Sequence, residues 1–73
     1  MNDKDYDNAL KFFKLNVKNN PTNANVHDSL GECYKTMGDK KNAVKYLKKS
    51  LSLDPPANVK ANSEKLLAEL DAM

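Results

Sequence analysis

The feature that most constrains this sequence is an internal repeat with a period of 34 residues. When the chain is aligned with itself at this offset, a segment near the N-terminus matches one in the middle. The identical pairs are Asp5/Asp39, Asn8/Asn42, Ala9/Ala43, Lys11/Lys45, Lys14/Lys48 and Pro21/Pro55. The apolar pairs of similar size are Leu10/Val44, Phe12/Tyr46, Phe13/Leu47 and Val17/Leu51. A fixed period of this length indicates stacked copies of one supersecondary unit, which cannot bury its hydrophobic face alone.

Apolar residues recur at spacings of three and four in four stretches of the chain, which predicts four helices. The predicted helices span roughly 5–18, 23–37, 39–53 and 57–72. The breaks between them are 19–22, 38–39 and 54–56. Gly38 and Asp39 leave only a short connection, so the second and third helices should pack as an antiparallel pair. No alternating strand pattern occurs, and the predicted fold class is therefore all-α.

The central part of the chain resembles the tetratricopeptide repeat family, whose period is also 34 residues. The residues that carry the resemblance are Leu30, Gly31, Tyr34, Gly38, Ala43, Leu47, Leu51 and Pro55. The resemblance implies one domain over 1–73, a right-handed solenoid fragment of antiparallel helix-turn-helix units. Residues 24–57 would be the full repeat, 5–20 the second helix of a partial repeat, and 58–72 a capping helix.

Some positions depart from the family's pattern. His27 stands where the family usually has a large aromatic residue, and Ser50 stands where it usually has alanine. In the last helix, Glu64 and Lys65 fall where leucine and glycine are expected. A shift of two or three residues after the proline pair would place the following leucines better, so the register of this helix stays open.

Composition excludes several classes of function. All 12 basic residues are lysine and the net charge is only +2, which argues against nucleic-acid readout, because arginine is preferred for bidentate contacts. No apolar run approaches the length of a membrane span, and no signal peptide opens the sequence. A full-length chain of this kind would be cytoplasmic. The expected partner is therefore a protein or peptide, and neither a nucleic acid nor a membrane is expected as a partner.

Few side chains suit catalysis or metal binding. His27 lacks a partner in a recognised catalytic arrangement, and Cys33 has apolar neighbours that would raise its pKa rather than activate it. One cysteine and one histidine are too few for a structural zinc site. We expect both side chains to pack in the core, and we expect no catalytic residue, no metal, no cofactor and no enzyme activity.

A polar row on the second helix is the predicted binding surface, because first helices of such repeats line the concave groove. The row consists of Asn25, Asp28, Glu32 and Lys35. Repeats of the carboxylate-clamp type hold chaperone C-terminal peptides through lysine and asparagine, whereas the matching positions here are Asp28 and Glu32. The sequence therefore predicts a neutral or basic peptide partner, not an acidic tail. The alternative is that the row is only a solvated surface.

The first helix carries an apolar set for which the sequence offers no covering helix. We predict that part of this set stays open and docks on a parent domain, on a second copy or on an exchanged helix; docking on a second copy would give a homo-oligomer. The set is Leu10, Phe12, Phe13 and Val17. The favoured function is a protein interaction or scaffold module, and the two surfaces above are its expected sites. The alternative is a structural or self-assembling helical unit, natural or engineered, without a dedicated ligand.

Overall fold

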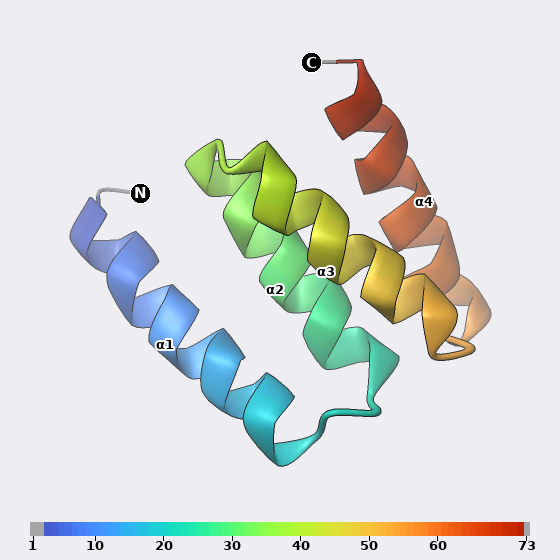
Figure 1. The fold of residues 1–73 in the computed structure, drawn as a ribbon, viewed down its shortest axis with the longest axis horizontal. Coiled ribbons are helices and arrows are strands. Elements are labelled where there is room, and N and C mark those ends of the chain that lie inside the picture. Colours follow the sequence, from blue (N-terminus) through green and yellow to red (C-terminus); the bar gives the residue numbers. More distant parts are fainter. Residues whose placement is uncertain (1–2, 73) are drawn as a thin grey trace.

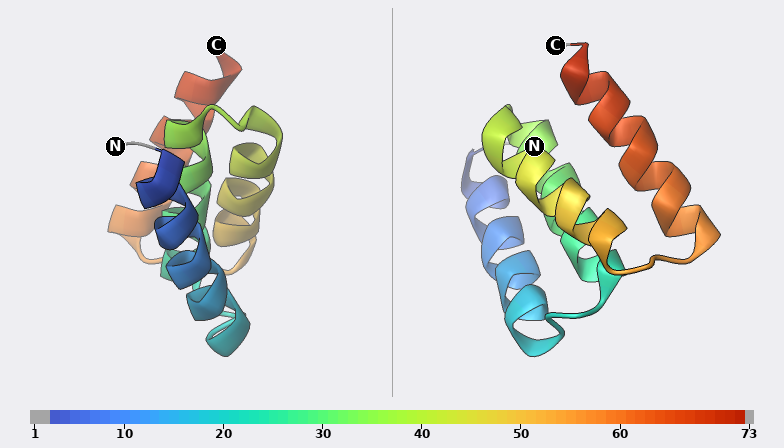
Figure 2. Two further views of the ribbon diagram at one scale, coloured as in Figure 1. Left: turned by 90° about the vertical axis from the view of Figure 1, so that its left-hand side faces the viewer. Right: turned by 45° about the vertical axis from the view of Figure 1, so that its right-hand side comes forward.

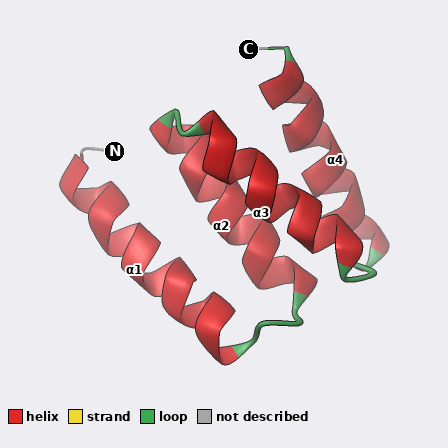
Figure 3. Ribbon diagram, viewed as in Figure 1, coloured by secondary structure: helices red, strands yellow, loops and turns green. Residues whose placement is uncertain are grey.

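The computed structural model describes residues 3–72, and within that range every regular element is a helix. The helices are α1 (Asp3–Asn19), α2 (Ala24–Met37), α3 (Lys40–Ser52) and α4 (Ala57–Asp71). Each runs antiparallel to the one before it, and α1 and α4 flank the hairpin of α2 and α3 (Figure 1, Figure 3). The predicted all-α class and the four helices are confirmed, with every helix end within two residues of its predicted place.

The connection between α2 and α3 follows from two residues. Gly38 ends α2 with a φ of 87°, a left-handed conformation that glycine adopts without steric cost. The backbone N–H groups of Gly38 and Asp39 donate to the carbonyls of Lys35 and Tyr34, which satisfies the last turn of α2. The Asp39 side chain then caps α3 by accepting hydrogen bonds from the side chain and backbone of Asn42. These hydrogen bonds, the side-chain one foremost, lower the pKa of Asp39.

The hydrophobic core lies between α2, α3 and α4. Its buried members are Leu30, Tyr34, Ala43, Leu47, Leu66 and Leu70. Gly31 allows α2 and α3 to approach closely, because a Cβ atom placed there would lie 2.7 Å from Leu47 Cγ. The two helices therefore cross closely at Gly31, with the leucine from α3 in the space that a side chain on Gly31 would need.

The register of α4 is resolved by its burial pattern. An offset of 36 residues, two more than the repeat, relates its inward-facing residues to those of α2. The related pairs are His27/Ser63, Leu30/Leu66 and Tyr34/Leu70. An unshifted register would have turned Glu64 and Lys65 inward, and burying unpaired charges is costly. The same shift places Leu67 at the position that corresponds to Gly31.

The helices differ in how many neighbours they contact. Within the described chain, α2 contacts each of the other three helices, whereas α1 contacts α2 alone. The last helix packs on both members of the central hairpin and runs beside α3 over its length (Figure 2). None of the helices in residues 3–72 is both long and apolar enough to cross a bilayer. One side of α1 and the outer groove between α3 and α4 are thus left for contact with other molecules.

Candidate functional site

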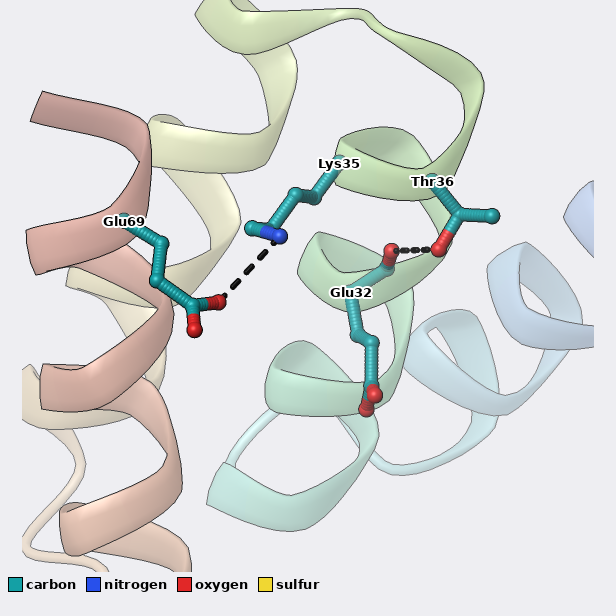
Figure 4. A network of polar contacts seen from close by, with 4 residues as sticks. All are labelled: Glu32, Lys35, Thr36 and Glu69. Carbon is teal, nitrogen blue, oxygen red and sulfur yellow. Dashed lines mark hydrogen bonds and ion pairs between the residues drawn. The ribbon is translucent and has the colours of Figure 1, made fainter. Parts of the chain in front are cut away.

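Figure 4 shows two residues of the predicted polar row, Glu32 and Lys35, on α2, with Lys35 directed towards Glu69 of α4. Glu32 is exposed there, and Lys35 forms an ion pair with Glu69 of α4, with 3.2 Å between Nζ and Oε1. Thr36 donates a hydrogen bond to the backbone carbonyl of Glu32, at 3.0 Å, so its hydroxyl belongs to the helix. Asn25 is exposed at the start of α2, where its backbone N–H donates to Asn23.

Asp28 does not belong to the accessible row. Its side chain is buried, with 5% of the residue exposed, and α4 covers it. Oδ1 accepts a hydrogen bond of 2.6 Å from the Ser63 hydroxyl, and Oδ2 accepts one of 2.8 Å from the Asn62 amide. The expectation that Asp28 faces a ligand is therefore wrong: its carboxylate joins α2 to α4. On the face that α2 and α4 share, Glu32 remains an exposed carboxylate, and the charge of Lys35 is balanced by Glu69.

The apolar set on α1 divides into two groups. Leu10, Phe13 and Val17 are partly buried and pack against the core, so these three do not form an open surface. Phe12 is 61% exposed and touches Phe13 edge-on, with 5.6 Å between ring centroids. Leu15, which the sequence reading overlooked, is 54% exposed. Leu15 follows Phe12 by three residues, which places both side chains on one face of the helix. This spacing could have predicted that Leu15 belongs to the same surface as Phe12.

His27 and Cys33 are both buried, as their sequence context indicated. His27 Nε2 donates to the Pro21 carbonyl oxygen at 2.8 Å, and the imidazole stacks on Tyr46 with 6.1 Å between centroids. Burial raises the pKa of the Cys33 thiol, which disfavours the nucleophilic thiolate. Each side chain therefore has a packing role that accounts for its position. Among the described residues, no group of histidine, cysteine and acidic side chains is placed to hold a metal ion.

A pocket of about 260 Å³ opens between α3 and α4, on a different side of α4 from the ion pair. Val44 and Leu67 supply its apolar lining, and three charged residues surround them. The charged residues are Lys40, Lys48 and Asp71. This pocket could not be predicted from the sequence, because it depends on how α4 packs beside α3.

Comparison with known proteins gives one match. Residues 24–56, which cover α2, α3 and the turn after them, match the sequence model of the tetratricopeptide repeat family. No curated protein and no solved structure matches the chain. The matched segment contains Gly31, Gly38 and Leu47, which form the close crossing and the tight turn described above.

Proposed function

We propose that this chain binds a neutral or basic peptide on the face of α2 and α4 that carries Glu32, Lys35 and Glu69. Residues 24–56 match the tetratricopeptide repeat, a unit that generally contacts other proteins and is generally non-catalytic. The observation that carries the proposal is the charge of that face. Glu32 is exposed, and the neighbouring Lys35 is already paired with Glu69. A basic side chain therefore gains a carboxylate partner there, whereas an acidic tail meets repulsion.

The position of Asp28 strengthens the argument against an acidic tail. A carboxylate clamp needs a cationic or amide side chain directed at the ligand, but here the position holds a buried carboxylate that is fully engaged by Asn62 and Ser63. Asn25 and Glu32 are the remaining exposed side chains of the row on α2, and they offer hydrogen bonds and one negative charge. We expect weak and salt-dependent binding, because exposed ion pairs contribute only about 0–1 kcal/mol each.

The test is a nuclear magnetic resonance titration of the whole chain with two peptides that differ only in charge, one basic and one acidic. The basic peptide should shift the amide signals around Glu32. The Glu32→Lys variant should instead bind the acidic peptide more tightly than the basic one. Asp7→Lys makes the same charge change at an exposed position of α1 and should leave both affinities nearly unchanged. Tighter binding of the acidic peptide to the wild-type chain at this face contradicts the proposal.

A second candidate function is association through α1, and the exposure of Phe12 and Leu15 favours it. Apolar side chains grouped on an unpartnered helical face gain free energy when another surface removes them from water. We propose that this pair docks on a second copy of the chain or on a neighbouring domain. This proposal also treats α1 as the second helix of a partial repeat.

Sedimentation equilibrium across a wide concentration range tests association through α1. The average mass should rise with concentration for the wild-type chain and stay at the monomer value when Phe12 and Leu15 are both replaced by serine. Because both side chains are largely exposed, the double variant should keep its helical circular dichroism. A wild-type chain that stays monomeric at millimolar concentration rules out self-association and leaves only a different protein as the partner.

A further inference from the structure

The groove between α3 and α4 combines an apolar floor with a basic rim. Val44 and Leu67 form the floor, and the exposed side chains of Lys40 and Lys48 lie on the α3 side. The pocket volume, about 260 Å³, is below the range of about 300–1,000 Å³ typical of sites for drug-sized ligands. A space of this size suits one apolar side chain rather than a whole small molecule.

The charge of α3 points to the sign of the partner. The helix carries lysine at positions 40, 41, 45, 48 and 49 and has no acidic residue. The one ion pair among the side chains of residues 6–72 lies elsewhere, between Lys35 and Glu69. Asp71 lines the pocket from α4 but comes within ion-pair distance of neither lysine of the rim. The lysines of α3 are therefore available to carboxylates of another molecule.

Two alternative occupants fit this groove poorly. A second copy presenting α1 would bring Lys11, Lys14 and Lys18 towards the lysines of α3, and like charges repel. A further helix packed as closely as α3 packs on α2 requires a glycine, whereas Leu67 occupies the corresponding position of α4. The groove accepts a side chain inserted from above more readily than a helix laid against its floor.

The geometry points to this groove as a docking site for an acidic protein segment that inserts one large apolar side chain between Val44 and Leu67. Carboxylates on either side of that anchor pair with Lys40 and Lys48, and the remaining lysines of α3 extend the attraction along the helix. The site is separate from the proposed peptide face on α2 and has the opposite charge preference. Its existence does not depend on the function proposed above.

The probe is a blocked peptide with a central leucine flanked by glutamates, titrated into the isotopically labelled chain at low salt. Saturable shifts are expected at Val44 and Leu67, with little change around Glu32. Replacing the peptide's leucine by serine should weaken binding about tenfold, because the gain from burying an apolar side chain is lost. Absence of saturation, or shifts confined to α2, overturns the inference.

Variants of the rim make the test specific. Lys48→Glu should weaken binding about fivefold, while Asp71→Asn should strengthen it, because a repulsive carboxylate is removed. Lys14→Glu makes the same change of charge on α1 and should have no such effect. Equal loss in Lys14→Glu, equal binding of the serine peptide, or matching shifts with a DNA duplex would show an unspecific polyanion surface and overturn the inference. Circular dichroism confirms that each exposed-site variant stays folded.

Discussion

The substitution Gly31→Ala tests the close crossing of α2 and α3 most directly. The added Cβ would lie 2.7 Å from Cγ and 2.9 Å from Cδ2 of Leu47, and 3.1 Å from its backbone nitrogen. Contacts below 3.0 Å require atoms to move, and Cγ is a branching atom near the backbone, not the free end of a flexible side chain. The two helices must therefore separate, or Leu47 must leave its position in the core.

The expected magnitude is a balance of two terms. Overpacking a tight core costs about 1–3 kcal/mol, and the blocked geometry at Leu47 places this case near about 3 kcal/mol. Alanine is the better helix former by about 1 kcal/mol. The net loss of about 2 kcal/mol is large for a domain of this size, whose core rarely supplies more than about 3–5 kcal/mol. Thermal unfolding followed by circular dichroism should show a decrease in Tm of about 10 °C.

Two controls separate packing from helix propensity. The pair Glu32→Gly and Glu32→Ala makes the same exchange at the neighbouring exposed position, where alanine should be favoured by about 1 kcal/mol. In a Leu47→Ala background, held folded by a stabilising sulfate salt, Gly31→Ala should cost less stability than in the wild type, because the blocking side chain is absent and only the contact of 3.1 Å with the backbone nitrogen remains. A single Gly31→Ala variant as stable as the wild type would refute the reasoning.

Three further outcomes are expected. Gly38→Ala should lower the unfolding free energy by about 1–2 kcal/mol in urea denaturation, purely from the positive φ, because no atom lies within 4 Å of the added methyl; an unchanged midpoint would contradict this. Asp28→Ala should cost about 1–3 kcal/mol by leaving the Ser63 hydroxyl and the Asn62 amide without their acceptor, and amide hydrogen exchange should increase mainly in α4. Because the folded pKa of Asp39 is lowered, its contribution is present above the ordinary aspartate pKa and is lost as pH falls through the folded value. Asp39→Asn should therefore lose less stability than the wild type in acid, and parallel pH profiles would contradict this.

The elements of this fold were predictable because their determinants are local. Helical spacing, the caps at Asn23 and Asp39, and the glycine at position 38 act within a few residues, so the helices and the tight turn could be placed from sequence. The close crossing at Gly31 was also accessible, because Gly31 is one of the residues that carry the resemblance to the tetratricopeptide repeat. The burial of Cys33 followed from its apolar neighbours, and that of His27 from its place at a position where the family usually has a large aromatic residue.

The parts that could not be predicted depend on where α4 packs. Asp28 has the spacing of a solvated residue, and only the position of Ser63 and Asn62 beside it shows that it is buried. The two-residue shift of α4 follows the proline pair, whose effect on register no local rule supplies. The α3–α4 groove likewise exists only after that shift has brought Leu67 next to Val44.

The unequal contacts of the helices determine how disturbances spread through the molecule. Because α1 touches α2 alone, it can detach while the other three helices keep their core. Because α2 touches all three, its loss exposes every interface at once. Detachment of α1 is thus opposed by a single interface, whereas the other three helices are held together by interfaces that do not involve α1.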